Sequence, residues 1–267
     1  APAWRPGPRG RHPTAEAAVD AACSKGTAPM TTSTRRPLST AAIALTFAVA
    51  IAALPRPAAA TWSLVWADEF NGTSLDAANW APDLGDGCPD LCGWGNNELQ
   101  YYRSQNVAVT GGNLVLTARA ESFGGRAFTS GKVTTRGKRT FLYGRVEMRA
   151  KLPTGGGMWP AFWMMPAADV YGGWAASGEI DIMESANATT TVGGALHYGG
   201  SFPDNTSTSG SYSLGGANFA DDFHVYAVEW EPDAIRWYVD GTLFMTRTSA
   251  QWYSNNAPGN DRAPFDQ

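Results

Sequence analysis

Short runs of alternating apolar and polar residues, separated by Gly, Asn, Asp and Pro, recur along the chain from Thr61 onward. Side chains of a β-strand point alternately to the two faces of a sheet, so these runs predict strands with one buried face. No long window carries the helical period. The runs lie at residues 64–70, 113–119, 143–152, 158–165, 179–185, 225–231 and 235–246.

The last of these runs contains Asp240-Gly241 between its two halves, which is typical of a hairpin with a type I′ turn. Many strands with turn signals at this density predict an all-β fold, a β-sandwich jelly roll of two antiparallel sheets. Residues 257–267 have the composition of a loop. A jelly roll usually ends by threading a last strand into a sheet, so we expect a domain over residues 61–267 that lacks its last strand or strands.

One apolar run, GEIDIMES at 178–185, carries the three acids Glu179, Asp181 and Glu184. Glu179 and Asp181 point the same way in a regular strand, whereas Glu184 would face the opposite side. A β-bulge around Ile182-Met183 would shift the phase and return Glu184 to the face of the other two. The spacing therefore predicts three carboxylates on one concave face, with Ile180 and one or both of Ile182 and Met183 buried behind.

Three like charges on one face repel, so at least one acid should hold a proton near neutral pH. Retaining glycoside hydrolysis needs such an arrangement: one carboxylate attacks the anomeric carbon, and a protonated one about 5–5.5 Å away donates to the leaving oxygen. The middle acid would share a hydrogen bond with the nucleophile and separate the two pKa values. Composition and spacing leave a solvated strand face and a calcium site as alternatives.

The segment before Thr61 has a separate explanation. Residues 30–60 combine a basic start, an apolar run at 38–54 and Ala58-Ala59-Ala60, which is the pattern of an export signal peptide. A membrane anchor is the alternative, but the run is Ala-rich and a cleavage-like site follows it directly. Residues 1–29 precede Met30 and are expected to be an upstream or artefactual segment outside the domain. We expect a secreted protein with no membrane association after signal cleavage.

The charge of the chain limits which partners it can bind, and its cysteines indicate a disulfide. The formal net charge is -4, and residues 1–60 hold seven Lys/Arg against two acids, so the remainder is more acidic still. An acidic body argues against nucleic-acid partners; we expect a monomer. Cys88 and Cys92 in CPDLC are an even pair that predicts a loop-closing disulfide, with two free thiols as the alternative. A zinc site is improbable, because no second Cys or His pair stands at ligand spacing.

Several blocks beyond the acid strand carry a family resemblance. GEIDIME, with MWPAFWMMP before it and LHYGG after it, resembles the active-site block of glycoside hydrolase family 16. WADEFNG, GWGNNELQYY, YGRVEMRAKLP and HVYAVEWEPDAIRWYVDG resemble that family in the expected order, from about Trp62 to Gln267. The residue inserted between Asp181 and Glu184 resembles the bulged branch, and the GWGNNELQYY block is most similar to endo-β-1,3-glucanases (laminarinases).

The resemblance implies a concanavalin-like jelly roll, a β-1,3-glucan substrate and no cofactor for catalysis. By position it implies that Glu179 is the nucleophile, Asp181 the assisting acid and Glu184 the acid/base. It also implies six substrate-binding residues: Asn97, Arg136, Trp159, Trp163, Trp174 and His197. Core packing is the alternative for the tryptophans, and simple solvation for the Arg and the Asn.

Glu69 resembles the start of a structural calcium site, although the family takes a further ligand from the final strand. Two other functions stay open. One is a β-glucan-binding protein without catalysis on the same fold, although such proteins typically lose one of the acids. The other is a family 16 hydrolase of agarose, carrageenan or mixed-linkage glucan, and the acidic body does not favour a sulfated substrate.

Overall fold

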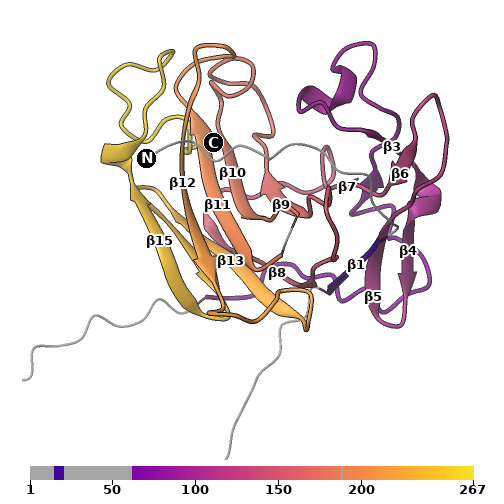
Figure 1. Ribbon diagram of the computed structural model, residues 1–267. Helices are drawn as coiled ribbons and strands as arrows, with labels where there is room; N and C mark the ends of the chain where they lie inside the picture. Colours follow the sequence, from indigo (N-terminus) through magenta and orange to yellow (C-terminus); the bar gives the residue numbers. More distant parts are fainter. Residues whose placement is uncertain (1–14, 21–61, 188) are drawn as a thin grey trace, which may run out of the picture.

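Two antiparallel sheets form the body of the protein in a computed structural model that describes residues 15–20, 62–187 and 189–267 (Figure 1). The larger sheet has the strand order β15-β14-β13-β8-β1-β5-β4, and the smaller has the order β12-β11-β10-β9. The larger sheet consists of β1 (Ala15–Asp20), β4 (Val107–Thr110), β5 (Asn113–Ala118), β8 (Gly144–Lys151), β13 (His224–Glu231), β14 (Ala234–Val239) and β15 (Thr242–Thr248). The smaller sheet consists of β9 (Ala161–Met164), β10 (Glu179–Glu184), β11 (Thr191–Tyr198) and β12 (Thr206–Ser213).

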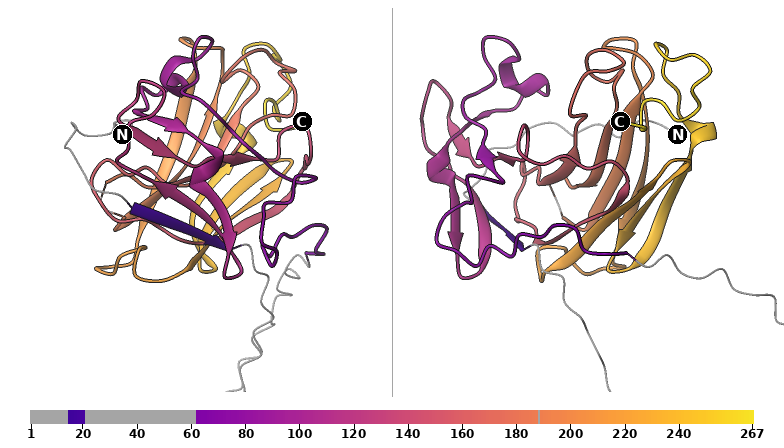
Figure 2. Two further views of the ribbon diagram at one scale, coloured as in Figure 1. Left: turned by 90° about the vertical axis from the view of Figure 1, so that its right-hand side faces the viewer. Right: turned by 180° about the vertical axis from the view of Figure 1, so that it is seen from behind.

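Two short strand pairs lie beside the edge formed by β9 (Figures 1 and 2). The antiparallel pair is β2 (Ala81–Pro82) with β7 (Val133–Thr134), and the parallel pair is β3 (Gln100–Tyr102) with β6 (Phe128–Ser130). Helical structure within the described residues is limited to three 3-10 turns: η1 (Cys92–Gly95), η2 (Ser104–Asn106) and η3 (Ser249–Gln251). The predicted all-β class and the jelly-roll sandwich are confirmed.

The core lies between the two sheets. Ile180, Ile182 and Leu196 of the smaller sheet pack against Val228 and Trp237 of the larger one. The Trp237 indole crosses this layer, and its Nε1 donates to the Asp181 carbonyl oxygen at 2.7 Å. Gly194 is required under that ring, because a Cβ at this position would lie 2.4 Å from Trp237 Cδ1. The acid strand is therefore held to the core through its own backbone.

Most of the predicted strands are present, and the predicted hairpin is confirmed. β14 and β15 pair around Asp240-Gly241, whose φ angles of 48° and 76° are those of a type I′ turn. The predicted strand at 64–70 is wrong. That segment forms no strand, because its Asp68 side chain binds local groups, the Phe70 N–H and Trp80 Nε1, each at 2.9 Å.

Two segments at the ends of the chain need separate mention. Residues 1–29 were expected to lie outside the fold, yet Ala15–Asp20 forms β1, paired with both β5 and β8. Residues 257–267 form a loop, as predicted, and Phe265 of this loop is buried against the core. The predicted export signal at 30–60 lies outside the described residues. Among the residues that are described, no helix has the length and apolar character to cross a membrane.

Candidate active site

Strand β10 carries the three acids, and it contains the predicted bulge. Its register against β11 shifts between Asp181 and Glu184, where two residues of β10 stand opposite one residue of β11. The register against β9 shifts in the same interval. Ile180, Ile182 and Met183 are all buried, so the extra residue returns Glu184 to the face of Glu179 and Asp181.

Each acid has a close neighbour, and two of the three accept a hydrogen bond from it. Trp174 Nε1 donates to Glu179 Oε2 in a short hydrogen bond, and Trp159 Nε1 donates to Glu184 Oε1 at 2.9 Å. His197 stands opposite Glu179 in the ladder, and its Nε2 lies 3.2 Å from Asp181 Oδ2. That approach does not have the angles of a hydrogen bond, and Asp181 Oδ2 has no hydrogen-bond partner among the described residues.

Burial sets the protonation of these carboxyls. It is the largest cause that raises the pKa of Glu179, Asp181 and Glu184, each to about 7. The negative charge of Asp181 raises the pKa of both glutamates further. Glu179 and Asp181 also share a hydrogen bond, which raises the pKa of Glu179 and lowers that of Asp181, while the Trp174 N–H lowers the pKa of Glu179. The site therefore holds protons at neutral pH that ordinary carboxylates would release.

A cationic and aromatic group extends the same face beyond the acids. Trp163 of β9 stands opposite Asp181 in the ladder, so its side chain lies on the face of the acids. Lys132 Nζ lies 5.0 Å from the Trp163 ring centroid and 4.2 Å from that of Trp94 in η1. A desolvated cation over an aromatic ring is stabilised by about 2 kcal/mol or more. Lys132 and Trp94 were not among the predicted site residues.

Comparison with known proteins shows which family shares this sequence. Residues 94–261 match the model of the family described as glycosyl hydrolases family 16. The glucan endo-1,3-beta-glucosidase A1 of Niallia circulans is 47% identical over 225 residues, 79% of this chain and 33% of that protein. The chain thus spans about a third of the length of the Niallia relative. The beta-glucanase of Rhodothermus marinus is 42% identical, with coverage of 72% of this chain and 70% of that protein.

A solved structure of a laminarinase is also similar to this chain. The laminarinase catalytic domain from Thermotoga maritima superposes with a TM-score of 0.65 at 40% identity, over 71% of this chain and 78% of that one. The chain belongs to glycoside hydrolase family 16. The family and the laminarinase-type resemblance seen in the sequence motifs are therefore confirmed, and the protein is a glycoside hydrolase.

The structure places the family 16 substrate-binding candidates in two groups. Trp159, Trp174 and His197 contact the acids directly, and Trp163 lies beside them. Arg136 is exposed, and its Nη2 lies 3.0 Å from Asp83 Oδ1. Asp83 Oδ2 also lies 3.4 Å from Lys132 Nζ. Arg136 is therefore linked to the face of the acids through the carboxylate that it shares with Lys132.

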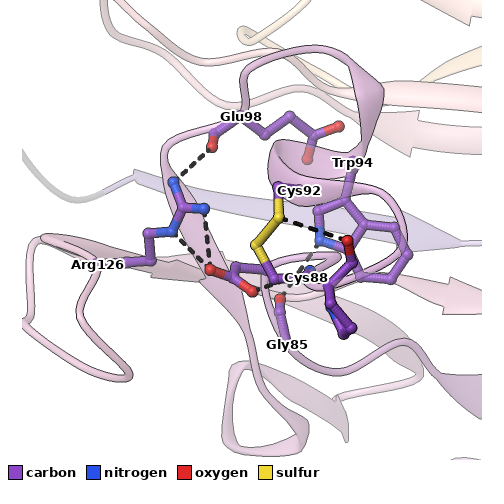
Figure 3. Close-up of a disulfide and its surroundings, with 8 residues drawn as sticks. Gly85, Cys88, Cys92, Trp94, Glu98 and Arg126 are labelled. Atoms are coloured by element: carbon purple, nitrogen blue, oxygen red, sulfur yellow. Dashed lines mark hydrogen bonds and ion pairs between the residues drawn. A yellow bond between two sulfur atoms is a disulfide. The ribbon is translucent and has the colours of Figure 1, made fainter.

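Asn97 lies in the loop that follows the disulfide. The predicted bond between Cys88 and Cys92 is present, and Arg126 fastens the loop by contacts with Asp86 and the Glu98 carbonyl oxygen (Figure 3). Asn97 itself is exposed and lines a surface pocket with Glu98 and Arg126. Its contact with substrate stays a prediction, as does that of Arg136.

The predicted calcium site at Glu69 finds no support in the ligands nearby. Calcium takes six to eight oxygens, and the adjacent Asp68 carboxylate already accepts hydrogen bonds from Phe70 and Trp80. In the part of the chain that the structure describes, no group of three or more His, Cys, Asp or Glu side chains could hold a metal ion. Calcium at Glu69 stays a prediction from the family resemblance.

Proposed function

We propose that this protein is an endo-β-1,3-glucanase that hydrolyses laminarin-type glucans with retention of anomeric configuration. The observation that carries the proposal is the set of three carboxyls on one face of β10, one buried (Asp181) and two partly buried, each with a pKa raised to about 7. A retaining glycosidase needs one ionised and one protonated carboxyl at the same pH, and this site supplies both. The names of the relatives, which include glucan endo-1,3-beta-glucosidase and laminarinase, support β-1,3-glucan as the substrate.

In the first step, Glu179 attacks the anomeric carbon while the Glu184 carboxyl donates its proton to the leaving oxygen. The Trp174 N–H favours the ionised form of Glu179, as a nucleophile requires. Asp181 is the most buried of the three, and it shares a proton with Glu179. In the second step, Glu184 takes a proton from water, which attacks the glycosyl-enzyme and restores the β configuration.

Two azide experiments test these roles. With an activated β-1,3-glucoside, Glu179→Ala leaves room for azide on the α face and should yield an α-glycosyl azide. Glu184→Ala still forms the covalent intermediate, which azide then attacks to yield a β-glycosyl azide. The opposite pattern would show that the two roles are reversed.

The substrate is tested by release of reducing ends from a linear β-1,3-glucan, with lichenan, agarose and carrageenan alongside. Selective release from the β-1,3-glucan supports the proposal, and release from another polymer alone would replace it. Binding of β-1,3-glucan without release from any polymer would identify a glucan-binding protein. Glu179→Gln serves as the matched inactive control, since it removes the charge and keeps the shape.

We also propose that the protein is exported by its signal peptide at 30–60. The pattern of that segment and the Cys88–Cys92 disulfide both support an oxidising compartment outside the cytosol. Mass spectrometry of the protein recovered from the medium of a bacterial host should find an N-terminus at Thr61. Retention in the cell with an uncleaved N-terminus would contradict export.

A further inference from the structure

Lys132 lies where three aromatic rings from separate parts of the chain come together. Its Nζ is 4.2 Å from the centroid of Trp94, 5.0 Å from that of Trp163 and 5.5 Å from that of Tyr102. These rings belong to η1, β9 and β3, three elements in different segments of the chain. The ammonium thus contacts both the smaller sheet, through Trp163, and the disulfide-bonded segment, through Trp94.

The charge of Lys132 is balanced locally. Asp83 Oδ2 lies 3.4 Å from Nζ, and the two side chains are only 19% and 11% exposed. The backbone fixes the pair as well, since the Asp83 N–H donates to the Lys132 carbonyl oxygen at 2.9 Å. A cation this far from water interacts more strongly with an aromatic ring than an exposed one does. Asp83 and the low exposure therefore hold Lys132 in one position against the rings.

Both tryptophans contact Lys132, and Trp163 also presents surface next to the acids. Trp163 shares the face of Asp181 and is 37% exposed, so part of its ring is open to a ligand. Trp94 is partly buried, and its Nε1 is directed to the Gly85 carbonyl oxygen (Figure 3). Its ring is edge-on to Tyr102, with the centroids 5.6 Å apart. Aromatic rings of this kind cover the apolar C–H faces of sugar rings. Trp163 and Trp94 thus continue the face of the acids as one aromatic wall.

We propose that Lys132 is a positioning residue that holds Trp94 and Trp163 in this wall, and that the wall selects β-glucan chains long enough to extend from the acids to Trp94. The proposal rests on the glucanase function given above. Lys132 acts through the two rings and takes no part in proton transfer, which Glu184 and Glu179 carry out. The wall recognises the face of a neutral hexose unit remote from the bond that is cleaved.

The test compares Lys132→Met, which keeps the apolar stem and removes the charge, with Lys132→Arg, which keeps a cation. Steady-state constants are measured on β-1,3-gluco-oligosaccharides from the shortest one cleaved to long chains. For Lys132→Met we expect KM on long chains to rise about tenfold, as the loss of two cation–ring contacts implies. The value of kcat, and both constants on the shortest substrate, should change by less than about twofold. Lys132→Arg should restore most of the loss.

Two controls separate positioning from other roles. Lys151→Met makes the same change at a lysine whose Nζ donates to the Asp221 carbonyl oxygen, and it should leave all constants unchanged. In a double-mutant cycle, Lys132→Met should add little to the effect of Trp94→Ala, because both changes dismantle the same wall. Additive effects would show that Lys132 contacts the sugar independently of Trp94, and an equal loss on all chain lengths would show a structural role. Either result overturns the proposal.

Failure of the proposed function can be told apart from failure of this inference. Glucan binding to Glu179→Gln is followed by tryptophan fluorescence, which does not require hydrolysis. One outcome is that the unmodified protein cleaves no glucan, that Glu179→Gln binds long chains, and that the double variant Glu179→Gln with Lys132→Met binds them about tenfold more weakly. That outcome contradicts only the hydrolytic function. If hydrolysis is normal and Lys132→Met has no dependence on chain length, only the role of Lys132 is contradicted. Absence of both hydrolysis and binding contradicts both.

Discussion

Replacement of Asp181 by Asn should stabilise the protein at high pH while it lowers activity. Asp181 is 2% exposed, and its pKa rises from 3.8 to about 7 because burial penalises the charged form. The folded state therefore binds more protons than the unfolded state between about pH 4 and pH 7. The contribution of this group to stability is present below pH 4 and is lost as the pH rises through 7.

The magnitude follows from the shift. About three pKa units correspond to about 4 kcal/mol of penalty at pH 8 for an ionised Asp181. The variant also removes the negative charge of Asp181, which raises the pKa of Glu179 and Glu184. The variant weakens the hydrogen bond that Asp181 shares with Glu179, so we expect a net gain of about 2 kcal/mol at pH 8. At pH 4 the carboxyl is neutral in the fold, and the variant should differ from the unmodified protein by less than about 1 kcal/mol.

The assay is thermal unfolding of both proteins at pH 4 and pH 8, with Asp261→Asn as an exposed control. A gain of about 2 kcal/mol corresponds to roughly 4–8 °C in Tm for a domain of this size. Equal Tm differences at the two pH values, or a variant that is less stable at pH 8, would refute the claim that ionised Asp181 destabilises the folded protein. The Asp261→Asn control should show no gain at either pH.

Five other variants have defined outcomes. Glu179→Gln and Glu184→Gln should each lower kcat on a β-1,3-glucan by at least about 100-fold with Tm retained; activity within about tenfold would contradict their roles. Gly194→Ala should lower the free energy of unfolding by about 1–3 kcal/mol in urea, because its Cβ would lie 2.4 Å from Trp237. Cys88→Ser with Cys92→Ser should cost about 2 kcal/mol from loop closure, and no loss in urea would show that the bond is not needed. The chain that begins at Thr61, which is the form proposed to be exported, lacks β1, and the loss of the pairing with β5 and β8 should cost roughly 3 kcal/mol relative to the uncleaved chain; equal urea midpoints for the two chains would contradict this.

The strands and the acid face could be predicted from sequence because both depend on local alternation. The two-residue period makes Glu179 and Asp181 neighbours on one face, and the broken period indicates the bulge without knowledge of other segments. β12 was missed for the same reason. Its sequence TSTSGSYS has no apolar alternation, and it becomes a strand only because β11 offers eight residues for pairing in register.

Contacts between distant segments could not be predicted from local patterns. Lys132 follows β6 and Trp163 lies in β9, and nothing in the sequence around either residue shows that they meet. The run at 64–70 failed for a related reason, since alternation there reflects side chains that pack by tertiary contacts, such as Phe70 with Trp80. Local propensity is a weak guide wherever such contacts determine the backbone.

The bulge in β10 serves the core as much as the active site. A regular strand with one residue fewer between Asp181 and Glu184 would also place all three acids on one face, since alternation alone achieves that. The additional residue gives the strand two successive inward side chains, Ile182 and Met183, which enter different hydrophobic clusters. Ile182 packs with Trp237 and Leu196, whereas Met183 belongs to the cluster that contains Phe219. The strand that bears the three carboxyls is thus anchored in two of the hydrophobic clusters, and this anchoring offsets the cost of their burial.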